Sequence, residues 1–280
     1  MTVNTAGTTD AGRALKAKHR AMWAFGDYPA VATDLVAGLG PILVGACQVR
    51  PGDRVLDVAA GTGNAAIPAA VAGASVVASD LTPELLETGR REAERRGTTL
   101  EWREADAEDL PFADNEFDTV MSCLGVMFTP FHQASAGELV RVCRPGGTLG
   151  LLNWTPEGFI GQLFATMKPY APPPPPGAQP APLWGLEEHV RSLLGDRVTD
   201  VRASRRSVQV DLFGRPEGFR DYFKARYGPV IAVYRGMADD RQRTAALDAD
   251  LADLARRHDR GSGSTVMEWE YLLLTARKRP

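Results

Sequence analysis

Glycine and aspartate residues between positions 54 and 80 are spaced in a way that could bind a nucleoside. The apolar run 54–59 is typical of a buried strand, and Gly61 and Gly63 follow it at the start of an expected helix. Glycines at such a turn let a ligand contact the backbone. Asp80 ends the next expected strand, where an acid can accept hydrogen bonds from both hydroxyls of a ribose. The spacing therefore predicts a site for an adenosine derivative.

Two cofactors compete for this loop. The segment 61–66 satisfies the G-x-G-x-x-A form of the dinucleotide fingerprint, so an NAD(P)-dependent oxidoreductase is one interpretation. Asp57 stands four residues before Gly61, and its charge would repel a pyrophosphate unless it were paired or solvated. S-adenosylmethionine carries an ammonium group and a positive sulfonium, and both tolerate a nearby carboxylate. Asp57 thus favours S-adenosylmethionine over NAD.

The elements that must position these residues alternate between strand and helix along the chain. The expected strands are 54–59, 75–78, 100–104, 117–123 and 148–154, with helices at 64–72, 82–96 and 134–143. This alternation is typical of a parallel sheet, in which ligands bind at the carboxyl ends of the strands.

The flanking segments differ from this core. Apolar residues at helical spacing predict two or three helices before Val49, and the prolines at 172–176 indicate a lid or insertion. Further elements are expected as a strand or hairpin arm at 198–212, helices near 216–235 and 239–258, and a strand at 266–275. We therefore expect an α/β fold with a seven-stranded mixed sheet and one antiparallel strand at its edge. Its parts would be an N-terminal helical cap (1–49), a cofactor-binding core (50–155) and a C-terminal part (156–280).

Several motifs of the core resemble class I S-adenosylmethionine-dependent methyltransferases, in the small-molecule group similar to the ubiquinone and menaquinone biosynthesis enzymes. The resemblance lies in motif I at 55–64, the D-A-x-x-L-P-F segment at 106–112, the fourth-strand signature at 117–120 and the helix and turn at 138–147. It implies a Rossmann-like sheet with helices on both faces. It also implies transfer of a methyl group from S-adenosylmethionine to O, N or C of a small, apolar or aromatic molecule.

The resemblance assigns cofactor-binding roles to residues at matching positions. Asp57 would orient the methionine ammonium, Asp80 would hold the ribose, and Asp106 would accept a hydrogen bond from the adenine amine. The other implied cofactor-binding residues are Ala59, Gly61, Thr62, Gly63, Leu81, Ala107, Ser122 and Cys123.

Candidates for catalysis and for acceptor binding lie outside the glycine loop. His132 follows the fourth strand, where a neutral imidazole would take a proton from the acceptor, and a helix cap is the alternative. Trp23 and Tyr28 lie in the N-terminal helices, and Tyr170 and Trp184 flank the proline run. These four aromatic residues are candidates for binding an apolar acceptor, with core packing as the alternative.

Composition excludes several other classes of protein. The 280 residues are 44% hydrophobic and 24% charged, with a formal net charge of -3, as in a globular chain without a one-sign field for nucleic acid. Cys47, Cys123 and Cys143 lack the spacing of a metal site or disulfide framework, so we expect no metal and a cytoplasmic, reducing environment. No apolar run is long enough for a membrane span. A catalytically silent, methyltransferase-like scaffold protein remains an alternative, and the sequence defines neither the acceptor nor the oligomeric state.

Overall fold

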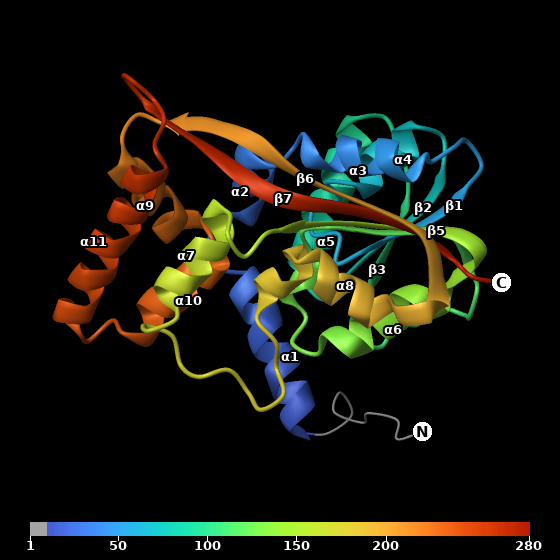
Figure 1. The fold of residues 1–280 in the computed structure, drawn as a ribbon, viewed down its shortest axis with the longest axis horizontal. Coiled ribbons are helices and arrows are strands. Elements are labelled where there is room, and N and C mark those ends of the chain that lie inside the picture. The colour runs from blue at the N-terminus through green and yellow to red at the C-terminus, as the bar shows by residue number, and fades with distance from the viewer. Residues whose placement is uncertain (1–9) are drawn as a thin grey trace.

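A single seven-stranded sheet forms the centre of the computed structural model, which describes residues 10–280 (Figure 1). The strands are β1 (Arg54–Val58), β2 (Ser75–Asp80), β3 (Glu101–Glu104), β4 (Phe117–Cys123), β5 (Cys143–Trp154), β6 (Val198–Phe213) and β7 (Thr265–Lys278). Their order in the sheet is β3-β2-β1-β4-β5-β7-β6. This arrangement confirms the expected seven-stranded mixed sheet.

The position of the antiparallel strand differs from the expectation. Strands β1 to β5 pair in parallel, whereas β7 pairs antiparallel with both β5 and β6. The antiparallel strand therefore lies inside the sheet, and β6 forms the edge. The chain reaches the edge first and returns through β7 to fill the gap beside β5, an order that local sequence patterns do not encode.

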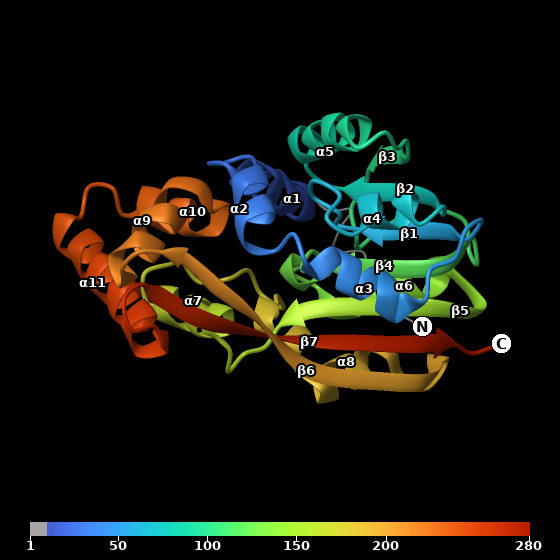
Figure 2. The same cartoon turned by 90° about the horizontal axis from the view of Figure 1, so that it is seen from above.

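Helices cover both faces of the sheet, as Figure 2 shows from above. The helices are α1 (Asp10–Trp23), α2 (Tyr28–Leu35), α3 (Leu39–Cys47), α4 (Ala66–Val71), α5 (Pro83–Arg95), α6 (His132–Val142), α7 (Phe159–Met167), α8 (Glu187–Leu194), α9 (Pro216–Arg226), α10 (Gly228–Gly236) and α11 (Arg241–His258). Short 3-10 turns are η2 (Val126–Phe128), η3 (Ala181–Gly185) and η4 (Gly195–Arg197). Helices α3 and α4 lie on one face, and α6 and α8 lie on the other (Figure 1).

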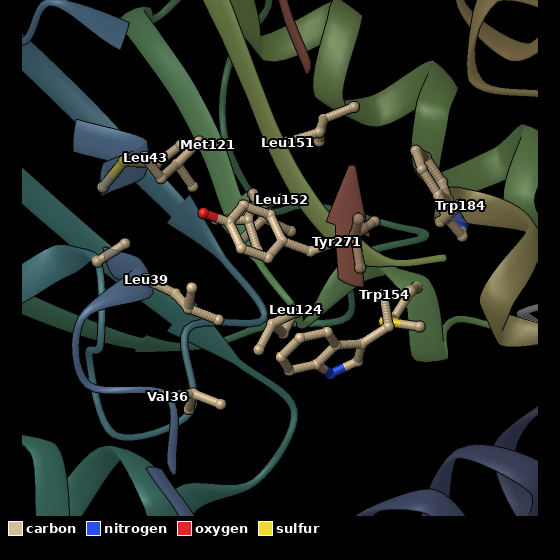
Figure 3. Packing of buried hydrophobic residues seen from close by; sticks show 14 of the residues in the cluster. Val36, Leu39, Leu43, Met121, Leu124, Leu151, Leu152, Trp154, Trp184 and Tyr271 are labelled. Atoms are coloured by element: carbon tan, nitrogen blue, oxygen red, sulfur yellow. The ribbon is translucent and has the colours of Figure 1, made fainter. Parts of the chain in front are cut away.

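Apolar side chains fill the space between these layers (Figure 3). Leu39 and Leu43 of α3 point toward Tyr271 of β7 on one side of the sheet, and Trp184 lies on the other side. Strand β1 is buried from Val55 to Val58, as expected for a central strand covered on both faces. The carboxyl ends of the central strands are thus held rigidly, which is what a ligand site at that edge requires.

Strands β6 and β7 extend beyond the sheet as a twisted arm that reaches α7, α9 and α11 (Figures 1 and 2). Trp269 on the arm stacks on Phe159 of α7, with ring centroids 5.2 Å apart and planes at 7°. The segment expected as a lid or insertion contains helices α7 and α8, which the sequence interpretation missed. Its apolar face, including Phe159 and Trp184, is buried against the sheet and the arm.

Within residues 10–280, no single helix is long and apolar enough to cross a membrane. Helices α2 and α3 reach that length and apolarity only together, and the chain bends by 69° between them. Their apolar residues, among them Leu35, Leu39 and Leu43, are buried in the core.

Candidate active site

A cavity with about 620 Å³ of empty space lies at the carboxyl ends of β1, β2 and β4. This is the edge at which the strand order reverses, where open α/β sheets bind ligands. The loop after β1 contributes Ala59 and Gly61, and the end of β2 contributes Asp80. Asp106 after β3 and Gly125 after β4 complete the strand side of the cavity.

The loop between β1 and α4 has an unusual backbone conformation. Ala59 has φ 54° and Gly61 has φ 56°, both in the left-handed region. Non-glycine residues adopt this region at a cost, so Ala59 is held there by its surroundings. A Cβ atom on Gly125 would lie 2.1 Å from the carbonyl oxygen of Ala59, so glycine at this position lets the two loops pack closely. The backbone of the loop consequently forms the cavity wall without intervening side chains.

Asp80 links this loop to the end of β2. Its Oδ2 accepts a hydrogen bond from the Gly61 amide at 2.8 Å, and its Oδ1 accepts one from the Thr82 amide at 2.8 Å. Burial raises the pKa of this carboxyl group, and the amide hydrogen bonds oppose that shift. Each carboxylate oxygen has a second lone-pair site, so Asp80 can accept further hydrogen bonds from a ligand in the cavity.

Asp57 lies behind the loop and does not line the cavity. It is 1% exposed, and its Oδ2 accepts a hydrogen bond from the Ala66 amide at the start of α4, at 2.8 Å. Among the described residues its Oδ1 has no hydrogen-bond partner, and burial raises its pKa to about 8. Asp57 therefore accepts a hydrogen bond at the first turn of α4 and also carries an oxygen without a partner. The sequence interpretation predicted neither feature.

Helix α1 covers the cavity with the predicted residue Trp23 and with two residues that the sequence interpretation missed, Lys16 and His19. Lys16, His19 and Trp23 line it, at spacings that place them on one helix face. The Lys16 ammonium donates to Asp106 Oδ1 at 2.8 Å and to Glu108 Oε2 at 2.6 Å. The Glu108 carboxyl group also accepts from the Phe131 amide at 2.7 Å, so it ties α1 to the start of α6. The helical spacing of the three lining residues is visible in the sequence and could have predicted that they share one face. The ion pairs of Lys16 with Asp106 and Glu108 join distant parts of the chain, and no local sequence pattern indicates them.

The end of the cavity beyond Gly125 is apolar and aromatic. Its lining includes Leu124 and Phe128 from the segment after β4, neither of which the sequence interpretation named. Trp23 packs edge-on against both Tyr28 and Phe128, with ring centroids 5.4 Å and 4.7 Å apart. Burial raises the pKa of Tyr28 well above its usual range, so its phenol is neutral.

The structure brings together most of the predicted cofactor-binding residues. The residues that line the cavity are Ala59, Gly61, Asp80, Leu81, Asp106 and Ala107, together with the predicted acceptor-binding residues Trp23 and Tyr28. Thr62, Gly63, Ser122 and Cys123 do not line it. The Ser122 hydroxyl instead donates to Val58 O at 2.6 Å and accepts from the Val126 amide at 2.9 Å. It therefore joins β1 to the segment after β4.

His132 does not line the cavity, so its position does not match the expected role as a base. Its side chain is fully buried, and its Nδ1 lies 2.9 Å from His189 Nε2 on α8. Burial and the second imidazole lower its pKa to about 4. The sequence predicts His132 in the loop after β4, but α6 begins at His132 itself. The imidazole ring therefore points toward α8 and packs between the two helices.

Two further predicted residues also lie away from the cavity. Trp184 is fully buried with its ring centroid 5.5 Å from that of His132. The Tyr170 hydroxyl donates to the Asp250 carboxylate on α11 at 2.6 Å. Both residues pack the segment after β5 onto its neighbours, which was the alternative considered for them.

Comparisons with known proteins give a consistent family. A family model described as a methyltransferase domain matches residues 55–147. An uncharacterised protein of Mycobacterium tuberculosis is 54% identical over 278 residues, covering 99% of this chain and 100% of that protein. The demethylmenaquinone methyltransferase of Thermus thermophilus is 40% identical over 115 residues, which are 40% of this chain and 52% of that protein.

A solved structure supports the fold. The crystal structure of a putative methyltransferase from Bacillus halodurans matches with a TM-score of 0.57 and 20% identity, covering 86% of this chain and 99% of that chain. The residues that the family model matches run from β1 to β5 and include the loop after β1. Residues 55–147 therefore belong to the methyltransferase-domain family, and the whole chain has the fold of the methyltransferase structure that it matches.

Proposed function

We propose that this protein transfers a methyl group from S-adenosylmethionine to a small, apolar or aromatic acceptor. The observation that carries the proposal is that Asp80 and Asp106, at the ends of two neighbouring strands, face one cavity beside the Gly61 loop. Two spaced acceptors at strand ends suit the ribose and the adenine amine of one nucleoside.

The residues present fit this cofactor. Asp57 lies behind the loop, and its Oδ1 has no partner among the described residues, so an ammonium group bound at the loop would stabilise the ionised carboxylate and lower its raised pKa. Asp80 would hold the ribose, and Asp106 with the Ala107 amide would hold the adenine. S-adenosylmethionine supplies an electrophilic methyl group when bound.

The chain's own residues would contribute orientation and the exclusion of water. Helix α1 covers the cavity, and Lys16 and Arg20 hold this helix against the ends of β2 and β3 through Asp106 and the Leu81 carbonyl. Fixing an acceptor in line with the reacting carbon removes much of the entropic barrier to displacement. Such a displacement needs no dedicated base, and none of the four histidines in the chain is assigned that role.

The acceptor class follows from the aromatic end of the cavity. Trp23, Tyr28, Leu124 and Phe128 offer apolar surface and no charged side chain there. A planar or apolar molecule would gain free energy by burying its surface against them. The name of the Thermus relative, a demethylmenaquinone methyltransferase, agrees with such an acceptor.

The free cysteines support a reducing, cytoplasmic location. Cys47 and Cys143 are buried, Cys123 is partly buried, and all three are free thiols. Long-lived free thiols are usual in compartments that keep cysteine reduced.

Calorimetric titration separates the proposal from its alternatives. We expect saturable binding of S-adenosylhomocysteine and no binding of NADH at the same concentration. Binding of NADH alone would instead favour the oxidoreductase interpretation. Binding of S-adenosylhomocysteine without transfer of labelled methyl groups to any of a broad panel of quinols, phenols and amines would favour a scaffold protein.

A further inference from the structure

The amino edge of the sheet, opposite the cofactor cavity, carries a second hollow with a different chemistry. Two adjoining cavities, with empty volumes of about 700 and 430 Å³, share Cys47, Gln48, Thr148 and Arg277 in their walls. We call the two together the arginine hollow. It touches β4 at Asp118 and Thr119, whereas the cofactor cavity begins at Leu124, about 20 Å along the strand. The two sites are therefore separate.

The hollow exists because α3 ends before it covers the sheet. Helix α3 lies over β4, β5 and β7 and ends at Cys47 (Figure 2). Its last turn packs so tightly on β5 that a Cβ atom on Gly150 would lie 2.1 Å from Cys47 Sγ. Beyond Cys47 the same sheet face continues without a helix across it, and the side chains there form the floor of the hollow.

Strand register places polar side chains in that floor. Thr119 pairs with Thr148, Thr148 pairs with Arg277, and Arg277 pairs with Thr199. Paired residues on neighbouring strands project to the same face of a sheet, so these residues form one polar row. A polar row under an open hollow is arranged for a polar ligand, since an apolar one would gain nothing from it.

Only some of the arginine side chains around the hollow have a partner. Its walls carry Arg50, Arg144, Arg202 and Arg277. Arg144 is ion-paired with Asp118, and the Arg277 guanidinium donates to the Gly146 carbonyl at 3.2 Å. Within residues 10–280, no ion pair is formed by Arg50, Arg202 or Arg277.

The three carboxylates of the hollow offset these guanidiniums only in part. Asp118 accepts from Arg144 and from the Arg54 amide, and Asp53 accepts from the Arg50 amide at 2.8 Å. Among the described residues this leaves Asp200 as the one lining carboxylate without a hydrogen bond. At the end of α3, the carbonyls of residues 44 and 45 accept from the amides of residues 49 and 48. The hollow thus carries four guanidinium groups against three carboxylates, which is an excess of one positive charge.

We propose that the arginine hollow binds a small phosphate-bearing ligand, with Arg202 and Arg277 as its principal contacts. Guanidinium groups bind phosphate oxygens through paired, charge-assisted hydrogen bonds, which suits a ligand with more than one anionic oxygen. Thr148 and Gln48 add a hydroxyl and an amide as neutral donors on the same wall. The hollow lies on the opposite edge from the methyl-transfer site, so binding there does not depend on the acceptor.

Inorganic pyrophosphate is the probe, titrated by calorimetry into the full chain with S-adenosylhomocysteine present in saturating amount. We expect saturable binding, because the hollow is separate from the cofactor loop. In Arg202→Gln/Arg277→Gln the affinity should fall by at least about tenfold, since two charge-assisted contacts are lost. Arg202→Gln alone should weaken binding as well. This single variant serves if the double variant folds poorly, because the Arg202 guanidinium makes no hydrogen bond or ion pair within the described chain.

A charge-matched control separates this site from general attraction. Arg215→Gln/Arg241→Gln removes the same charge from exposed positions on the distal helices and should leave the affinity unchanged. Three results would overturn the proposal: no saturable binding to the wild type, an equal loss in both double variants, or binding of pyrophosphate that is seen only when S-adenosylhomocysteine is left out.

Discussion

Three aspartates at successive strand ends serve the candidate site in different ways because their surroundings differ. Asp80 is buried and bonded to two amides, Asp106 is partly exposed and paired with Lys16, and Asp57 carries an unsatisfied oxygen behind the loop. Residue type alone marks all three as acceptors. The contacts decide which part of a ligand each can reach.

Replacement of Asp80 tests the ribose contact. Asp80→Ala removes a charged acceptor and also releases the Gly61 and Thr82 amides, so S-adenosylhomocysteine binding should weaken by about 1–3 kcal/mol. Titration calorimetry measures this change. Asp80→Asn keeps one acceptor oxygen and should lose less, and unchanged affinity in Asp80→Ala would remove this residue from the site.

Buried His132, which contacts the half-buried His189, gives the stability a defined dependence on pH. The pKa of His132 is about 4 in the folded chain, against an ordinary imidazole pKa of 6.5, so the unfolded chain binds the additional proton between these limits. The contribution of His132 to stability is therefore complete above pH 6.5 and declines as the pH falls toward 4. Its slope reaches at most about 1.4 kcal/mol per pH unit.

Urea unfolding at a series of pH values checks this expectation. His132→Leu should show a smaller fall in unfolding free energy than the wild type between pH 6.5 and pH 5. Parallel pH dependence in both proteins would show that this imidazole does not control the effect. Methyl-transfer activity of the variant near pH 7 should persist where it remains folded, since His132 lies outside the cavity.

At the scale of elements, the central strands and helices follow closely from local sequence. Strand β4 has the predicted bounds 117–123, and α5 begins at Pro83 after Thr82, where proline is favoured. Alternating apolar runs and turn residues are sufficient for such elements. Helices α7 and α8 were missed because their identity depends on burial against the arm and the sheet rather than on capping signals.

The candidate site, like the fold, was predictable only where local sequence carries the information. Gly61 and Asp80 follow from spacing along strands, Asp106 follows from the family resemblance, and all three line the cavity. The contacts of Lys16 and the burial of His132 were not predictable, because each depends on a partner at least 57 residues away in sequence. Tertiary pairing of this kind leaves no local pattern.

Helix α1 depends on Lys16 for its attachment to the cavity. Lys16→Met would leave the Glu108 carboxylate, whose side chain is 5% exposed, without its cationic partner. We expect a loss of about 1–3 kcal/mol in unfolding free energy and weaker binding of S-adenosylhomocysteine, because the helix over the cavity is loosened. Chemical denaturation and calorimetry measure the two effects.

Lys18→Met provides the matched control on the same helix. Lys18 is exposed and forms no ion pair in the part of the chain that the structure describes. Its replacement should change neither quantity by more than about 0.5 kcal/mol. Equal behaviour of the two variants would contradict the role given to the Lys16 contacts.

At the scale of the whole molecule, the distal helices support the cover of the cofactor cavity. The Asp27 amide donates to the Arg226 carbonyl at 3.1 Å, and the Tyr222 hydroxyl donates to Asp34 at 2.7 Å. The Trp23 ring packs on the Tyr227 ring, with ring centroids 5.9 Å apart. These contacts join the helices on the β6–β7 arm to α1 and α2, so the far end of the chain stabilises the site near its start.

Trp269 is the packing centre of that distal region. It is 1% exposed and stacks on Phe159, so Trp269→Ala should lower the unfolding free energy by about 3–5 kcal/mol. Trp269→Phe retains an aromatic ring and should lose clearly less. Urea denaturation of both variants tests this, and a loss below about 1 kcal/mol in Trp269→Ala would mean that the arm is not a packed part of the fold.

The most direct test of the proposed function is a crystal structure of the protein with S-adenosylhomocysteine at saturating concentration. We expect density in the strand-end cavity, with the ribose hydroxyls on Asp80, the adenine amine near Asp106 and the ammonium on the side of Asp57. An empty cavity under these conditions, or the nucleoside bound at another edge of the sheet, would contradict the proposed function.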